Sequence, residues 1–170
     1  MSDAQLVIKE LTPQYFAQVL AINNANTPAV GELTIEELEF NVLNSLYAIV
    51  ITDSTELEVL AFCVTFAPGA LYASPNYLWF SNTYGDFVYL DRITVAAPQQ
   101  NRGLGALLYK TIEGYMVRDK TASLLTCEVN LQPPNPGSSR FHARLGFIEV
   151  STQETKPGIV VSLLVKNLQD

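Results

Sequence analysis

One segment restricts the fold of this chain more than any other, because it joins a strand to a helix through glycines. The β-branched run Ile93–Val95 is followed by polar residues and then by Gly103 and Gly105, after which apolar residues recur with helical spacing. The first turn of a helix has unpaired N–H groups and a partial positive charge, and glycine lets an anion approach that backbone closely. We therefore predict a mixed fold, α/β or α+β, with an anion site at this turn.

Two common nucleotide-binding loops do not match this turn. A Walker loop needs a Gly-Lys-Ser/Thr sequence, which this turn lacks, and a dinucleotide-binding loop needs a small residue where Leu108 stands. The pattern that remains is Gln100-x-x-Gly103-x-Gly105. Taken alone, this pattern also fits a helix that begins with incidental glycines.

The rest of the chain predicts one domain over residues 1–170, because 48% hydrophobic content at this length supplies a sizeable single core. The pair Thr12-Pro13 and the capping box of Thr34 and Glu37 predict helix starts. The stretch 67–86 is aromatic and rich in Pro, Gly, Ser and Asn, and it is assigned to neither a helix nor a strand. The expected strands are 5–9, 47–52, 59–66, 87–95, 124–130, 147–152 and 159–165, and the expected helices are 13–22, 35–46, 104–118 and 139–145. The order is therefore β-α-α-β-β-β-α-β-α-β-β.

Composition excludes several classes of partner. Ten basic and 17 acidic residues give a net charge of −7, which argues against nucleic-acid binding and slightly favours a cationic small molecule. No apolar run approaches the roughly 18 residues of a membrane span, and the first residues lack a secretory leader pattern. Cys63 and Cys127 lie in apolar runs and, with a single histidine, make a structural metal site improbable. We expect a cytoplasmic protein without nucleic-acid, membrane or metal partners.

Two motifs together resemble those of the GCN5-related N-acetyltransferase (GNAT) superfamily. The pattern Gln100-x-x-Gly103-x-Gly105 is similar to the loop that binds the diphosphate of coenzyme A in that superfamily. The later run from Asn135 to Phe147 is similar to its second motif, in which an asparagine precedes a short helix and Leu-Gly-Phe. The specific resemblance covers residues 87–150, whereas the N-terminal half agrees only in the order of its elements. It implies a single domain with a mixed, mostly antiparallel sheet of about seven strands and about four helices, in an uncharacterised bacterial branch.

The resemblance also implies acetyl-CoA as the cofactor, with no metal. In the superfamily, backbone groups of the fourth strand hold the pantetheine arm, and one of them stabilises the thioester oxyanion. The prolines around Asn135 cannot continue a strand ladder, and Asn135 is expected to contact that arm. The implied cofactor-binding residues are Ile93, Thr94, Val95, Gln100, Asn101, Arg102, Gly103, Leu104, Gly105, Ala106, Asn135, Ser138 and Phe141.

The superfamily's general acid is usually a tyrosine, and His142 stands at that position here. Imidazole donates a proton readily near neutral pH, so the resemblance implies that His142 protonates the departing thiolate. The alternative is a histidine that packs beside Phe141 on the short helix and takes no part in catalysis.

Glu128 is the first candidate for the general base. Alternation along its strand places Thr126, Glu128 and Asn130 on one face, opposite an apolar face. A carboxylate on an interior strand is costly unless it meets a cleft or a cation. Asp91 is the second candidate. Two alternatives remain open: a structural ion pair of Arg92 with either carboxylate, and deprotonation by water alone.

The acceptor pocket is expected near the aromatic stretch that precedes the fourth strand. Aromatic side chains there suit an apolar or cationic acceptor, although a segment that covers the core has a similar composition. Asn23 and Asn24, at the end of the first helix, are further candidates, although ordinary capping of the helix end explains them better. The candidate pocket residues are Tyr77, Phe80, Tyr84, Asp91, Asn23 and Asn24.

These motifs imply an enzyme that moves an acetyl group from acetyl-CoA to a primary amine of a small molecule or peptide, directly and in a ternary complex. No activated nucleophile is evident, which favours direct transfer. A non-catalytic module that binds coenzyme A or acyl-CoA is the alternative, and a transferase for longer acyl chains or carboxylate acceptors is a third. Dimers are common in the superfamily, so the resemblance also implies a homodimer as a candidate assembly.

Overall fold

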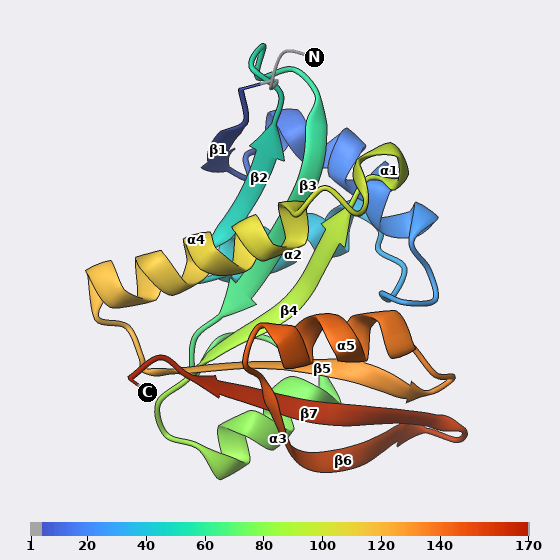
Figure 1. Ribbon diagram of the computed structural model, residues 1–170, viewed down its shortest axis with the longest axis vertical. Helices are drawn as coiled ribbons and strands as arrows, with labels where there is room; N and C mark the ends of the chain where they lie inside the picture. Colours follow the sequence, from blue (N-terminus) through green and yellow to red (C-terminus); the bar gives the residue numbers. More distant parts are fainter. Residues whose placement is uncertain (1–4, 170) are drawn as a thin grey trace. The chain divides into compact units, whose positions relative to one another are not determined.

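The computed structural model describes residues 5–169, which form two compact units. The N-terminal unit contains the described residues up to Thr65 together with Arg92–Ile112, and the C-terminal unit contains Phe66–Asp91 and the described residues from Glu113 onward. Seven strands follow one another in the hydrogen-bonded order β1-β2-β3-β4-β5-β7-β6, and β4 contributes to both units (Figure 1). Among the described residues, no helix is long and apolar enough to cross a membrane.

The order of elements confirms the predicted one, with one additional helix, α3. The strands are β1 (Val7–Glu10), β2 (Ala48–Thr52), β3 (Val59–Phe66), β4 (Val88–Val95), β5 (Leu124–Gln132), β6 (Ile148–Lys156) and β7 (Ile159–Asn167). The helices are α1 (Phe16–Ala25), α2 (Ile35–Asn44), α3 (Pro75–Thr83), α4 (Leu104–Asp119) and α5 (Pro136–Arg144), with 3-10 turns η1 (Pro13–Tyr15) and η2 (Ala97–Gln99).

Helix α3 lies in the aromatic stretch that sequence analysis left without an element. It begins with Pro75 at its first position, where the missing N–H costs nothing. Tyr77 and Phe80, three residues apart, are buried on the same side of the helix. Aromatic residues and asparagine are weak helix formers, so tertiary burial of these two rings stabilises a helix that local propensity does not indicate.

Local signals do fix the start of α2 in the N-terminal unit. The Glu37 N–H donates to Thr34 Oγ1 at 3.2 Å, and the Thr34 N–H donates to Glu37 Oε2 at 2.9 Å. This is the predicted capping box. The strands β2 and β3 pair antiparallel, with Ala48 opposite Val64, which confirms the predicted hairpin.

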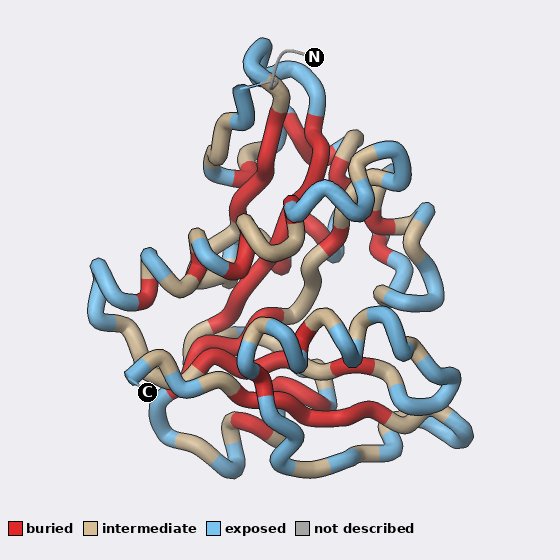
Figure 2. The backbone as a smooth tube through the Cα atoms, in the orientation of Figure 1, coloured by how far each residue is buried: buried red, intermediate tan, exposed pale blue. Residues whose placement is uncertain are grey.

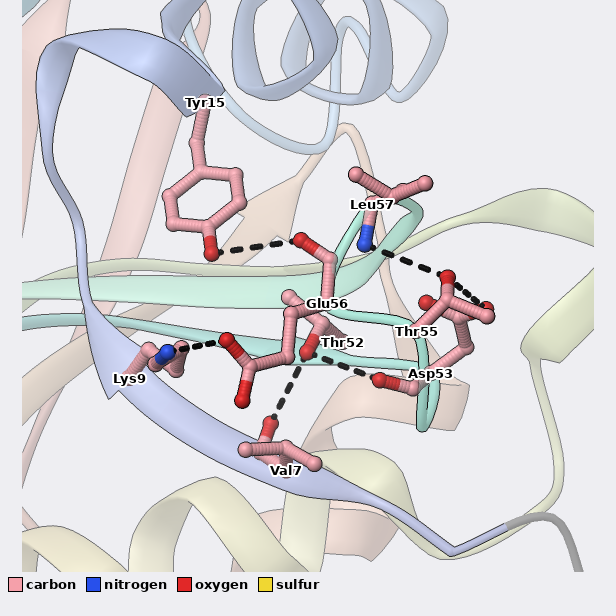
Figure 3. A network of polar contacts seen from close by, with 8 residues as sticks. All are labelled: Val7, Lys9, Tyr15, Thr52, Asp53, Thr55, Glu56 and Leu57. Carbon is pink, nitrogen blue, oxygen red and sulfur yellow. Dashed lines mark hydrogen bonds and ion pairs between the residues drawn. The ribbon is translucent and has the colours of Figure 1, made fainter.

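The turn of this hairpin is held by polar contacts with β1 and η1 (Figure 3). Lys9 forms an ion pair with Glu56, and the Tyr15 hydroxyl donates to the Glu56 carbonyl at 3.3 Å. Glu56 has a φ of 62°, a left-handed conformation that a side chain adopts at some cost. Within the same turn, the Asp53 carboxylate accepts a hydrogen bond from Thr55 Oγ1 at 2.6 Å.

The C-terminal unit is built on β5, β7 and β6, which pair antiparallel, and on the parallel contact of β4 with β5. Helix α5 lies in front of these strands and α3 lies behind them (Figure 1). Buried residues follow β4, β5 and β7, whereas β6 has none and the outward sides of the helices and the turns are exposed (Figure 2). Tyr89 of β4 is fully buried among the rings of α3, with ring centroids 5.6 Å from Tyr77 and 5.8 Å from Phe80.

Truncation of a core ring in β3 tests this account of the fold. Phe62 is completely buried, so we expect Phe62→Ala to lower the free energy of unfolding by about 3–5 kcal/mol through lost burial and a cavity. Phe40 on α2 is 48% exposed, and the matched change Phe40→Ala is expected to cost less than about 1 kcal/mol. Urea unfolding of both variants measures the difference, and equal losses would contradict the burial assigned to Phe62.

Candidate functional site

The glycine turn lies in the N-terminal unit, where β4 ends and α4 begins. Asn101 and Gly103 have φ angles of 61° and 80°, so the chain passes through two left-handed residues immediately before α4. Apart from Gly103 itself and its two neighbours in the chain, no heavy atom lies within 4 Å of the position that a Cβ at residue 103 would occupy. Just before the turn, Thr94 is buried, and its Oγ1 has no hydrogen-bond partner among the described residues. The first-turn N–H groups of α4 thus meet an open turn that suits an anion.

Polar side chains anchor this turn. Arg102 donates to Gln99 Oε1, which holds an exposed guanidinium beside the left-handed residues. Gln100 Nε2 donates to Val95 O at 3.4 Å and to Asn26 Oδ1 at 3.2 Å. Gln100, the first residue of the motif, therefore connects the turn to the segment that follows α1.

Arg92 and two asparagines organise the connection between α1 and α2 in the same unit. Asn23 is fully buried; its Oδ1 accepts from Arg92 Nη1 at 2.9 Å, and its Nδ2 donates to Gly31 O at 2.9 Å. Asn24 Nδ2 donates to Leu33 O, and the Leu33 N–H donates to Asn24 Oδ1, each at 3.0 Å. The amide groups of both asparagines are thus engaged with the loop that joins the helices, a role that their sequence context did not indicate.

Two carboxylates of the C-terminal unit accept hydrogen bonds from tyrosines. The Tyr89 hydroxyl donates to Glu128 Oε2 at 2.7 Å, and the Tyr72 hydroxyl donates to Asp91 Oδ1 at 2.5 Å. The predicted candidates Glu128 and Asp91 are both half-buried. Sequence analysis missed both tyrosines: alternation along β4 places Tyr89 on the face of Asp91, but Tyr72 precedes α3 and carries no such signal.

The three aromatic pocket candidates differ in burial. Tyr77 and Phe80 are 2% and 0% exposed and belong to the core of the C-terminal unit. The Tyr77 hydroxyl donates to Ala67 O at 2.6 Å, which fixes the segment before α3. Tyr84 is half-buried at the end of α3, and its ring stacks on Phe80 with centroids 6.4 Å apart.

His142 is buried in the C-terminal unit between two phenylalanine rings. Its ring centroid lies 5.2 Å from that of Phe141 and 5.5 Å from that of Phe147, and only 4% of the residue is exposed. Burial lowers the pKa of His142 below its usual value, against the opposing effect of the Ser138 carbonyl. Nδ1 is 2.8 Å from that carbonyl, so the neutral ring donates its proton there and carries its lone pair on Nε2.

Asn135 and Ser138 fix the helix that carries His142. Asn135 caps α5, because its Oδ1 accepts from the Ser138 N–H at 3.2 Å. The Asn135 N–H donates to Asn130 O at 3.2 Å, which closes the proline-containing turn after β5. Ser138 Oγ is 3.3 Å from His142 Nδ1. The residues of the second motif therefore form one connected structure.

The candidate residues fall into two groups, one in each unit. Asn23, Asn24, the β4 segment Ile93–Val95 and the turn Gln100–Ala106 belong to the N-terminal unit. The C-terminal unit contains the other candidates, which are Glu128, His142, Asp91, Asn135, Ser138, Phe141, Tyr77, Phe80 and Tyr84. Within residues 5–169, no group of three or more His, Cys, Asp or Glu side chains is placed to hold a metal ion.

Comparison with known proteins identifies a matching family and solved structures of similar fold. Residues 32–147 match the family described as Acetyltransferase (GNAT) family. The fold is similar to that of the ribosomal-protein-S18-alanine N-acetyltransferase from Escherichia coli, with a TM-score of 0.72 and 16% identity over 96% of this chain and 94% of that chain. It is also similar to Ard1 from Thermoplasma volcanium (TM-score 0.76, 14% identity, 97% and 99% covered) and to Arabidopsis thaliana NAA60 in complex with a bisubstrate analogue (TM-score 0.75, 15% identity, 96% and 98% covered). No curated protein sequence matches the chain.

The burial of His142 has a measurable consequence for stability. Its folded pKa lies below the ordinary value of 6.5, so the unfolded chain binds more protons at this site once the pH falls below about 6.5. The free energy of unfolding of the wild type should therefore fall, relative to His142→Asn, as the pH is lowered from 6.5 towards the folded pKa. Urea unfolding of both proteins between pH 5 and 8 measures this difference. A constant difference over that range would show that the ring is not held neutral.

Proposed function

The chain belongs to the acetyltransferase (GNAT) family, and from this premise we propose that it transfers an acetyl group from acetyl-CoA to a primary amine. The observation that carries the proposal is the left-handed turn at Gly103, which combines the family motif with an open approach to the start of α4. The similar structure from Escherichia coli is named an alanine N-acetyltransferase, which supports an amine of a peptide or small molecule as acceptor.

The residues of the turn fit the diphosphate of acetyl-CoA. Gly103 leaves room beside the backbone, the first-turn N–H groups of α4 offer donors, and Arg102 supplies a positive charge. The backbone of Ile93–Val95 is proposed to hold the pantetheine arm, and one of its N–H groups to stabilise the oxyanion. Acetyl-CoA supplies the activated acetyl group as a thioester.

Glu128 is proposed as the general base. The acceptor amine is an ammonium in solution and must lose a proton before its nitrogen attacks the thioester carbonyl carbon. A carboxylate fixed by the Tyr89 hydroxyl takes this proton directly or through a water molecule. Formation of the new C–N bond would accompany cleavage of the C–S bond, so that the sulfur of coenzyme A departs as a thiolate. The nitrogen would release its second proton to solvent as the amide forms.

His142 is proposed as the proton donor to that thiolate. In its neutral form the ring presents a lone pair at Nε2, so the acid role needs the imidazolium form. A negative thiolate nearby would favour this form and oppose the effect of burial on the pKa.

Two features support the alternative of a non-catalytic module that binds coenzyme A or acyl-CoA. His142 stands where the superfamily usually has a tyrosine, and burial disfavours the charged form that proton donation needs. The two functions share the cofactor and differ in turnover.

The cytoplasmic location and the homodimer remain predictions. Cys63 and Cys127 are both buried and neither is in a disulfide, which supports a cytoplasmic location for the protein. The homodimer implied by the family is checked by light scattering of the purified protein.

Binding of acetyl-CoA is the first property to test. A specific site adds about 2.7 kcal/mol to the free energy of unfolding at 100 times the dissociation constant, so acetyl-CoA should raise the melting temperature, whereas ATP and NAD should not. Gly103→Asp places a negative charge in the turn and should abolish the shift. Gly69→Asp is the matched control, because Gly69 also has an open, left-handed conformation, with φ 79°. No shift at millimolar acetyl-CoA would exclude both the enzyme and the binding module.

Turnover decides between the enzyme and the module. Acetyl transfer to a panel of amines, including peptides with a free N-terminal alanine, is expected for the wild type, whereas binding without transfer to any amine would favour the module. His142→Ala should lower kcat by about 10²-fold with little change in the KM for acetyl-CoA. His142→Asn, which can keep the hydrogen bond to Ser138 O, controls for loss of helix structure. A change in kcat of less than twofold would remove His142 from the mechanism.

A further inference from the structure

Two tyrosine–carboxylate pairs lie on one face of the strands in the C-terminal unit. Tyr89 of β4 is opposite Thr126 of β5 in a parallel register, and Asp91 and Glu128 each lie two residues further along their strands. Since side chains alternate along a strand, all of these residues use the same face. The Tyr89 hydroxyl donates to Glu128, and the Tyr72 hydroxyl donates to Asp91.

We infer that Tyr89 is a positioning residue, which fixes the Glu128 carboxylate and keeps it ionised so that it can take a proton from the acceptor. This inference rests on the proposed function, because it deepens the role given to Glu128. It names a residue outside both sequence motifs.

The Tyr89 ring is enclosed by other aromatic rings of the C-terminal unit. It is fully buried, and three rings surround it: Tyr77 and Phe80 at 5.6 and 5.8 Å, and Tyr72 at 6.4 Å between centroids. A buried ring in such a cluster has one orientation, so its hydroxyl occupies one place. The hydroxyl is then a fixed donor to a carboxylate that is itself only half-buried.

Tyr89 acts as a donor and not as a base. Burial raises the pKa of Tyr89 well above its usual value of 10, and the negative charges of Glu128 and Asp91 raise it further. The phenol therefore stays protonated at every pH at which an acetyltransferase of this kind would work. A hydrogen bond to the charged form of a carboxyl group favours that form, so Tyr89 lowers the pKa of Glu128 relative to the same site without the hydroxyl.

Other charged groups near Glu128 set the background for this effect. On the side of β4 the charged group is Asp91, which accepts from Tyr72. On the side of β7 the residue opposite Glu128 is the apolar Leu163. Helix α5 also packs on β5 and carries His142, but on the other side of the strands. None of these groups changes in a Tyr89→Phe variant, so a shift in the pKa of Glu128 reports the lost hydroxyl.

The test is the pH dependence of kcat for Tyr89→Phe, with saturating acetyl-CoA and the fastest acceptor from the amine panel. Activity falls on the acid side when Glu128 is protonated, and loss of a hydrogen bond to the carboxylate should move this limb to higher pH by about one unit. Glu128→Gln should lose the limb together with most of the turnover. An unchanged limb in Tyr89→Phe would overturn the inference, since a purely structural tyrosine affects stability without moving a pKa.

Two control variants separate the hydroxyl of Tyr89 from the loss of any hydroxyl. Tyr15→Phe removes a hydroxyl from a buried tyrosine of the N-terminal unit that donates to the Glu56 carbonyl, and it should leave the pH profile unchanged. Tyr72→Phe removes the donor to Asp91 and should move the limb much less than Tyr89→Phe. Equal shifts in Tyr72→Phe and Tyr89→Phe would contradict a specific role for Tyr89.

A second variant leaves the aromatic cluster intact, in case Tyr89→Phe does not fold. Glu128→Asp shortens the side chain and withdraws the carboxylate from Tyr89. An aspartate ordinarily titrates about 0.4 units below a glutamate, so an acid limb that moves to higher pH in Glu128→Asp would support the lost hydrogen bond. A limb that moves to lower pH would count against it.

A readout without turnover separates failure of this inference from failure of the proposed function. The ¹³C chemical shift of the Glu128 carboxyl, assigned with Glu128→Gln, gives its pKa directly in the wild type and in Tyr89→Phe. A raised pKa in Tyr89→Phe together with no acetyl transfer by the wild type would contradict the proposed function alone. Transfer that depends on Glu128, with the same carboxyl pKa in both proteins, would contradict the inference alone.

Discussion

The alternation of side chains along β4 is the constraint on which the candidate site depends. Tyr89 and Asp91 share one face of the strand, and the parallel register of Tyr89 with Thr126 places Glu128 on that face as well. The same strand ends at the glycine turn before α4. A single stretch of chain therefore carries a buried aromatic anchor, one of the two carboxylates and the turn with the family motif.

Features that local interactions determine could be predicted from the sequence. The capping box of Thr34 and Glu37 joins residues three apart, and the left-handed turn at Gly103 needs a glycine within a short pattern. Helix α3 was not predicted because burial of Tyr77 and Phe80 stabilises it, and burial depends on strands distant in the sequence. The order of the elements along the chain was predictable for a similar reason, because each strand is a short apolar or β-branched run bounded by turn residues.

The polar partners of the site could not be predicted, because they join residues far apart in the chain. Arg92 and Asn23 are 69 residues apart, and Tyr89 and Glu128 are 39 apart. The sequence indicated that a carboxylate in a covered sheet needs a cleft or a cation to offset the cost of its burial. In the structure, tyrosine hydroxyls donate hydrogen bonds to Glu128 and Asp91. The hydroxyls that bond them come from an aromatic stretch and a strand whose composition equally suits a core.

His142 stands where the family resemblance implies a tyrosine. This difference changes the chemistry of the candidate proton donor and does not affect the candidate base, Glu128. A phenol is a neutral donor near pH 7, whereas His142, with Nδ1–H bonded to the Ser138 carbonyl, presents an acceptor at Nε2 until it is protonated. Glu128 is on the face shared with Tyr89 and α3, and His142 is carried by α5 on the other side of the strands (Figure 1). The candidate base and the candidate acid of the proposed function are thus carried on opposite sides of β5. The proposed roles make opposite demands on the two side chains. Glu128 would act in its charged form and has a hydrogen-bond donor in Tyr89, whereas His142 would act as an imidazolium in a site that favours the neutral ring.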